Sequence, residues 1–142
     1  MSTTTKEKTN IKIGKITQVV GVVVDVEFST DHLPAIYNAL TIKHGGKTIY
    51  LEVAQHLDES SVRAISLAST DGLARGDEVK DTGAPISVPI GNATQGRMFN
   101  VTGDPIDGKD GTFTERASIH RRPPSLEEQS GKVEILETGI KV

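Results

Sequence analysis

The sequence contains no cysteine, and this absence excludes a disulfide scaffold, a thiolate zinc site and a cysteine nucleophile. Aromatic residues make up only 4% of the 142 residues, and the formal net charge is −3. General nucleic-acid binders use basic surfaces and stacking side chains, so a mildly acidic chain with few aromatic rings does not fit that class. The same charge argues against binding to an anionic membrane surface.

Long hydrophobic runs are also absent. The longest, Val19 to Val24, is interrupted by Gly21 and falls far short of the ~20 apolar residues that a membrane-spanning helix needs. Residues 1–10 are rich in Ser, Thr and Lys, and they lack the apolar region of a signal peptide and the arginines of a transit peptide. We therefore expect residues 1–10 to be a disordered, solvated tail and the protein to be cytosolic.

β-branched residues dominate what is present. Val and Ile together number 26, against 8 Leu, and their stiff side chains favour pleated strands over helices. Between residue 11 and about residue 83, alternating apolar and polar positions are interrupted by turn signals roughly every ten residues. This pattern predicts six short strands in a small antiparallel barrel or sandwich, and closure into a barrel removes the unpaired edges of an open sheet.

The alternation also predicts which side chains lie inside. We expect a strand that begins at Ile11, followed by strands over residues 22–28, 39–44, 47–57, 62–67 and 79–83. The apolar face of the second strand would comprise Val22, Val24, Val26 and Phe28, and that of the fourth Ile49, Leu51 and Val53. Gly45-Gly46 predicts a two-residue hairpin turn, because the favoured turns need positive φ.

After Pro85 the sequence becomes rich in turn residues. Residues 92–99 could form a short helix capped by Asn92, and Ser125 to Glu128 fit a capping box. About 55 residues with few periodic apolar positions are too poor in apolar content for a core of their own. We interpret this half as the beginning of a larger domain.

No nucleotide-binding motif is complete. A phosphate loop of the form G-x-x-x-x-G-K-[ST] is approached at Gly46-Lys47-Thr48, but its first glycine would fall at Thr41, and a hairpin is the preferred interpretation. Gly108-Lys109 and Gly131-Lys132 lack the Ser or Thr that must follow, and G-x-G-x-x-G is absent.

The sequence evidence for a metal or anion site is equally weak. None of the four histidines has the spacing of a metal ligand set; they are His32, His44, His56 and His120. Asp104, Asp107 and Asp110 recur at every third position without matching a calcium loop, so surface turns are preferred.

A local basic patch comprises Arg116, His120, Arg121 and Arg122. It could meet a phosphate or an acidic neighbour, although a solvated connecting strand is the simpler interpretation. The residues alone thus predict a β module and assign no catalytic, cofactor-binding or metal-binding residue.

Several stretches are nevertheless distinctive. They are residues 14–28, 33–40, 51–57, 70–73, 75–76, 89–91, 96–107, 119–121 and 137–142. Together they resemble the N-terminal part of the F-type ATP synthase beta subunit, over nearly all of residues 11–142. Leu33–Leu40 is the most specific stretch, because the related alpha subunit and the rotary vacuolar-type subunits lack this sequence.

The resemblance implies an all-β fold, with a six-stranded closed β-barrel over residues 11–84. Residues 85–142 would be the leading, incomplete segment of a RecA-like α/β nucleotide-binding domain. It also implies that the barrel joins alternating alpha and beta subunits in a hexameric ring around a central-stalk subunit. That complex would lie on the cytoplasmic face of a bacterial inner membrane, which this subunit reaches only through the complex.

The family binds Mg-ATP or ADP and couples proton transport to ATP synthesis with motifs that would lie further along the chain. We therefore assign no catalytic, cofactor-binding or metal-binding residue of the family to this chain. We expect the 142-residue chain alone to be inactive and to bind no nucleotide. The alternative is a stand-alone, non-catalytic β-barrel binding or assembly module, for example of the oligonucleotide-binding type. The few aromatic residues and the net acidic 11–86 segment disfavour oligonucleotide binding.

Overall fold

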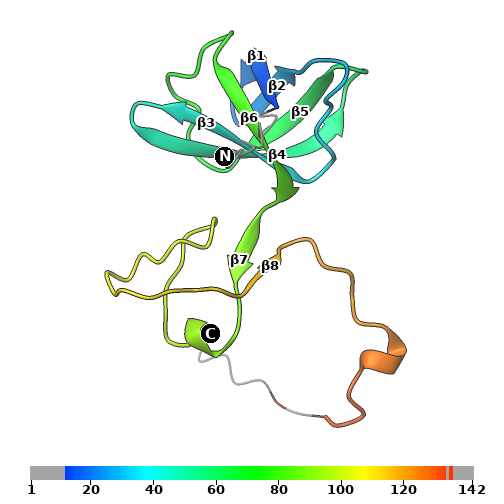
Figure 1. The fold of residues 1–142 in the computed structure, drawn as a ribbon, viewed down its shortest axis with the longest axis vertical. Coiled ribbons are helices and arrows are strands. Elements are labelled where there is room, and N and C mark those ends of the chain that lie inside the picture. The colour runs from blue at the N-terminus through cyan, green and yellow to red at the C-terminus, as the bar shows by residue number, and fades with distance from the viewer. Residues whose placement is uncertain (1–11, 134, 136–142) are drawn as a thin grey trace, which may run out of the picture.

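The computed structural model describes residues 12–133 and 135 (Figure 1). A closed barrel of six strands is followed by an extended, turn-rich segment that contains a two-stranded sheet. Figure 1 shows the two parts joined where strand β6 of the barrel runs on into β7. The expected tail over residues 1–10 and the distinctive stretch 137–142 lie outside the described residues.

The barrel is built from six antiparallel strands that alternate with turns. They are β1 (Ile13–Val20), β2 (Val23–Glu27), β3 (Asn38–His44), β4 (Lys47–His56), β5 (Ser61–Ser66) and β6 (Glu78–Pro85). Neighbours follow the order β1-β2-β5-β4-β3-β6, and β6 pairs with β1 to close the ring. The all-β prediction and the choice of a closed six-stranded barrel are confirmed.

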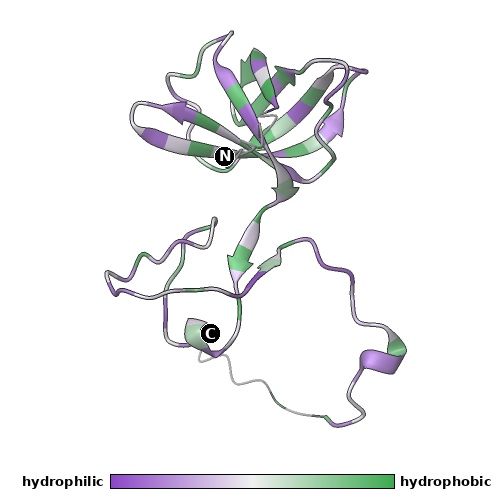
Figure 2. Cartoon of the chain, viewed as in Figure 1, coloured by the Kyte–Doolittle hydropathy of each residue, from purple (hydrophilic) through white to green (hydrophobic). Residues whose placement is uncertain are grey.

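The core lies inside the barrel and contains the inward-facing residue of each alternating pair. Figure 2 shows hydrophobic and hydrophilic residues following one another along the barrel strands. Its buried members are Ile16, Val24, Val26, Phe28, Leu40, Ile42, Ile49, Leu51, Val53, Val62, Ala64 and Val79. The predicted inward positions in β4 and most of those in β2 are confirmed. Val22 is the exception, since it lies with Gly21 in the tight turn between β1 and β2 and is 54% exposed.

Glycines form the turn between β3 and β4, but they do not mark the irregularity in the β1–β2 ladder. Gly45 and Gly46 have φ values of 54° and 77° and place His44 opposite Lys47, so the predicted hairpin is confirmed. The irregularity in the β1–β2 ladder falls between Ile16 and Gln18. It therefore does not lie at Gly14 or at Gly21, the two glycines nearest to it in the sequence.

The segment after the barrel contains β7 (Ser87–Pro89), paired antiparallel with β8 (Arg116–Ser118), and two short 3-10 helices, η1 (Asn92–Thr94) and η2 (Leu126–Glu128). This small ladder was not predicted. The described residues contain no parallel sheet in this segment, so a RecA-like continuation stays a prediction. Among the same residues, no helix has the length and apolar character needed to cross a membrane.

The predicted helix over residues 92–99 is wrong beyond its first turn. The residue in the N-cap position is Gly91 rather than Asn92, and the chain returns to an extended conformation at Gln95. Gly91 and Gly96, with φ values of 89° and 68°, bracket the turn in conformations that a helix does not use. The capping box at η2 is present, with the Ser125 N–H donating to Glu128 Oε2 at 3.0 Å.

Gly14 generates the first stability prediction, because β1 passes close to Phe28 at this residue. A Cβ at Gly14 would lie 2.8 Å from the Glu27 carbonyl oxygen and 2.8 Å from the Phe28 ring. We expect Gly14→Ala to lower the free energy of unfolding by about 1–3 kcal/mol, as overpacking does in other cores. Urea unfolding measures this change. Gly131→Ala, whose Cβ would meet nothing within 4 Å, is the control, and equal midpoints for the two variants would contradict the prediction.

Candidate functional site

The barrel closes at β6, which pairs with β1 on one side and with β3 on the other. The β1–β6 ladder is short and contains three Cα pairs: Ile13↔Lys80, Gly14↔Val79 and Lys15↔Glu78. The β3–β6 ladder has an irregularity between Asn38 and Leu40. Two backbone hydrogen bonds extend the β1 side of the seam, from the Ile16 N–H to the Asp77 carbonyl at 3.0 Å and from the Gly76 N–H to the Ile16 carbonyl at 2.8 Å. Side chains add further contacts across the seam.

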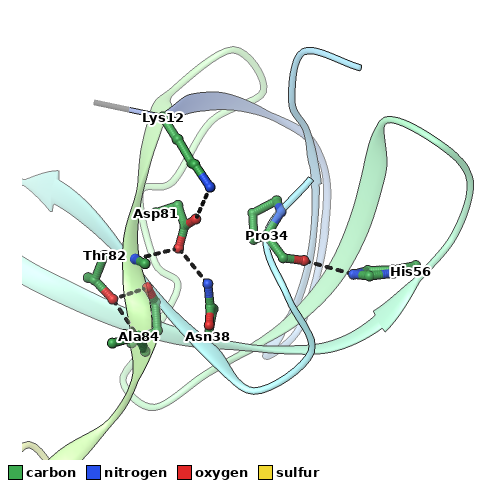
Figure 3. A network of polar contacts seen from close by, with 9 residues as sticks. Lys12, Pro34, Asn38, His56, Asp81, Thr82 and Ala84 are labelled. Atoms are coloured by element: carbon green, nitrogen blue, oxygen red, sulfur yellow. Dashed lines mark hydrogen bonds and ion pairs between the residues drawn. The ribbon is translucent and has the colours of Figure 1, made fainter. Parts of the chain in front are cut away.

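Asp81 occupies the seam, with a side chain that is 0% exposed (Figure 3). Its Oδ1 accepts hydrogen bonds from Asn38 Nδ2 at 3.1 Å and from the Gly83 N–H at 2.8 Å. Its own N–H donates to the Lys12 carbonyl at 3.0 Å. Its Oδ2 accepts no hydrogen bond from the described residues and faces Lys12 Nζ at 4.0 Å. One residue thus connects β6 to β3 and to the chain entering β1.

Two further polar contacts fix the chain around the seam (Figure 3). Thr82 Oγ1 lies 2.7 Å from the Ala39 carbonyl oxygen of β3. His56 Nε2 lies 2.7 Å from the carbonyl oxygen of Pro34, a fully buried residue in the loop between β2 and β3. These contacts anchor that loop and the end of β6 to the barrel wall.

The outer face of β1, β2 and β5 carries the second feature, an outer strip of Val20, Val23 and Ile65. Val20 and Ile65 are exposed, and all three residues align across the strands. The neighbouring row aligns Gln18, Asp25 and Arg63. A hollow of about 320 Å³ lies between the two rows.

Asp25 and Arg63 form a bidentate pair beside the outer strip. Arg63 Nε donates to Asp25 Oδ1 at 2.8 Å, and Arg63 Nη2 donates to Oδ2 at 2.9 Å. These hydrogen bonds and the positive charge of Arg63 lower the pKa of Asp25, against the opposing effect of burial. The outer face therefore combines apolar surface with a fixed, oriented charge pair.

The three aspartates of the turn-rich segment do not converge. Asp104 accepts hydrogen bonds from Thr102 Oγ1 and Asn100 Nδ2, which lower the pKa of Asp104. Asp107 pairs with Arg97, whose hydrogen bonds lower the pKa of Asp107. Asp110 also lies near Arg97, whose Nη1 donates to the Asp110 backbone carbonyl at 3.4 Å. The described residues contain no group of three or more His, Asp or Glu that could hold a metal ion.

The basic patch is also divided. Arg116 donates to the carbonyl oxygens of Ser87 at 2.7 Å and Thr102 at 2.9 Å. His120 Nε2 lies 2.8 Å from Glu52 Oε2 of β4, whereas Arg121 and Arg122 are exposed. Two of its four members therefore have structural partners within the chain, and the patch does not form a converged anion site.

Sequence reasoning identified none of the seam residues. Asn38 lies in the distinctive stretch 33–40, but it is 43 positions from Asp81, and no spacing or periodicity in the sequence links the two residues. Asp25 carried a weak signal, as an acidic residue within a run of valines.

The chain is also similar in sequence to a known protein family. Residues 16–83 match the ATP synthase alpha/beta family, beta-barrel domain. The match runs from within β1 to within β6 and includes the outer strip, Asn38 and Asp81. Residues 13–15 of β1, which pair with β6, precede the matched range.

Asp81→Ala tests the seam. The substitution leaves the Asn38 amide and the Gly83 N–H without their partner, and we expect a loss of about 1–3 kcal/mol in the free energy of unfolding. Asp81→Asn retains an acceptor oxygen and should cost less. Urea unfolding measures both variants against Asp31→Ala, which removes an exposed loop carboxylate. A loss for Asp81→Ala no greater than that of the control would contradict the role of Asp81.

The Asp25–Arg63 pair predicts a pH dependence. Because the folded-state pKa of Asp25 is lowered, the pair stabilises the fold above the unfolded-state pKa of about 3.9, and this contribution disappears as the pH falls through the folded-state value. The difference in urea midpoint between the unsubstituted chain and Asp25→Asn should therefore be largest near pH 7 and shrink towards about pH 3. Asp31→Asn is the control for loss of a charge alone. A difference for Asp25→Asn that is constant with pH would show that the pair does not contribute.

Proposed function

Residues 16–83 form a beta-barrel domain of the ATP synthase alpha/beta family, and on that premise we propose that the chain is the N-terminal part of the beta subunit of a proton-translocating F-type ATP synthase. In this role the barrel joins those of alternating alpha subunits in a hexameric ring. The complex lies at the cytoplasmic face of a bacterial inner membrane and includes a central-stalk subunit.

The choice of the beta subunit over the alpha subunit rests on the amino-acid sequence of Leu33–Leu40, since the family match covers both subunits. That stretch is built into the barrel. Pro34 is fully buried, and Asn38 donates to the buried Asp81. The residues that favour the beta subunit are therefore also residues that position β3 and the seam.

The observation that carries the assembly role is the outer strip on a barrel without free edges. A closed barrel offers no edge strand for pairing, so a neighbouring subunit must bind through side chains. Exposed apolar residues grouped beside a hollow are typical of protein–protein contacts. The adjacent Asp25–Arg63 pair supplies charges of both signs that can orient such a neighbour. We propose the barrel of an alpha subunit as that neighbour.

Catalysis is proposed to lie outside this part of the protein. Binding of Mg-ATP or ADP and the rotation-driven chemistry would belong to polypeptide that follows the barrel domain. The barrel would act as a rigid collar, so that hinge motions driven by the central stalk appear at the opposite end of the subunit. The 142-residue chain should then bind no nucleotide by itself.

Co-purification with the alpha subunit of the same organism tests this proposal. We expect native mass spectrometry to detect a complex with the 142-residue chain. Ile65→Lys should weaken that complex by at least about tenfold, because it places a charge within the apolar contact. Leu126→Lys, an exposed apolar residue far from the barrel in sequence, is the matched control.

Three results would contradict the proposal. They are the absence of a complex with alpha subunits, equal binding by Ile65→Lys and the unsubstituted chain, and tight binding of Mg-ATP by the chain in calorimetry. Binding of single-stranded DNA at low salt would instead support the stand-alone binding module.

A further inference from the structure

The segment that follows the barrel returns to contact it through His120. This residue lies two positions after β8, and its Nε2 is 2.8 Å from Glu52 Oε2 on β4. Its ring also stacks on Tyr37, with ring centroids 4.1 Å apart and an interplanar angle of 26°. The His120 and Glu52 side chains are 33% and 24% exposed, so the contact is partly shielded from water. One side chain thus makes both a polar and an aromatic contact with the barrel.

The barrel side of this contact is held rigidly. Tyr37 is the one non-glycine residue with positive φ among those described, at 73°. Such a conformation persists only where the surroundings enforce it. The Tyr37 N–H donates to the Val53 carbonyl of β4 at 2.8 Å, and His56 holds the same loop through Pro34. The ring of Tyr37 and the carboxylate of Glu52 therefore form a preformed receiving surface.

The His120 side is ordered by the small sheet. Ser118 pairs with Ser87 in the β7–β8 ladder, and the Ile119 N–H donates to the Ile86 carbonyl at 3.0 Å. The His120 N–H donates to Ser118 Oγ at 3.1 Å. Because both partners are ordered by their own surroundings, little conformational entropy is lost when they meet.

The rest of the boundary between the two parts contains the buried Ile86 and two hollows. Two hollows of about 390 and 370 Å³ separate Tyr50 of the barrel from Thr102 and Asp104 of the following segment. The Lys12–Asp81, Arg63–Asp25 and Arg97–Asp107 ion pairs each lie within one of the two parts, whereas the His120–Glu52 contact joins the barrel strands to the segment after Pro85. The covalent crossing from β6 to β7 would alone leave that segment free to rotate about the connection.

We propose that Tyr37, Glu52 and His120 form a latch that holds the β7–β8 segment against the barrel and fixes the direction in which the chain leaves it. The latch is a second attachment point beside the β6–β7 connection. It acts through a ring stack and a hydrogen bond, so its release requires no change in the barrel itself. The inference rests on the geometry of the described residues and does not depend on the proposed subunit identity.

Distance measurements on the 142-residue chain test the latch. The absence of cysteine allows spin labels to be placed at Lys47→Cys, on the β3–β4 hairpin, and at Lys109→Cys, in the turn-rich segment. We expect His120→Ala and Glu52→Ala to broaden the distance distribution between these labels. Arg122→Ala, which removes an exposed neighbouring cation, is the matched control and should leave the distribution unchanged.

Amide exchange separates loss of the latch from damage to the barrel. In His120→Ala, the amides of residues 86–88, 90 and 116–120 should exchange roughly tenfold faster, the effect expected for losing one ring stack and one partly exposed hydrogen bond. The amides of β1 to β6 should be unchanged. His120→Phe keeps the stack without the hydrogen bond and should give an intermediate increase.

Two outcomes would overturn the latch. The first is a distance distribution in His120→Ala that equals that of the unsubstituted chain or of Arg122→Ala. The second is a Glu52→Ala/His120→Ala double variant with a broader distribution than His120→Ala alone, because without His120 the Glu52 side chain has no part of the latch left to lose.

Discussion

Closure of the sheet by β6 is the constraint on which the rest of the structure depends. A six-stranded sheet left open would expose two edges and one flank of its apolar interior. β6 removes both edges by pairing with β1 and β3, yet its ladder with β1 contains only three residue pairs. The buried carboxylate of Asp81 compensates for this short ladder, because it connects β6 to Asn38 of β3 and approaches Lys12 at the start of β1.

Closure also determines what the outer face can do. Once the inward residue of each alternating pair is buried, the outward residues of adjacent strands align in rows. One row is apolar, with Val20, Val23 and Ile65, and the next holds the Asp25–Arg63 pair. A rigid wall keeps these rows in fixed register. The same wall holds Tyr37 and Glu52 in place for His120, so the surface proposed for a neighbour and the attachment of the following segment both derive from one closed sheet.

Alternation of apolar and polar residues was sufficient to predict the strands, the hairpin at Gly45-Gly46 and most of the core, because those features are local and periodic. The choice of a barrel followed from the number of strands and from the resemblance. The helix over residues 92–99 failed because two glycines with positive φ limit it to one turn. Asp81 and Asn38, or His120 and Glu52, could not be paired from the sequence. They are 43 and 68 positions apart, and such contacts leave no periodic signal.

Native-state hydrogen exchange over the 142-residue chain, with increasing denaturant, tests the closure account most directly. If β6 locks the sheet, the slowest amides of all six strands, those of β1 and β6 included, should open together with the same free energy and the same denaturant dependence. Residues 86–133 should exchange faster. Amides of β1 or β6 that open separately from those of β2 to β5, or uniformly slow exchange across both parts of the chain, would contradict the account.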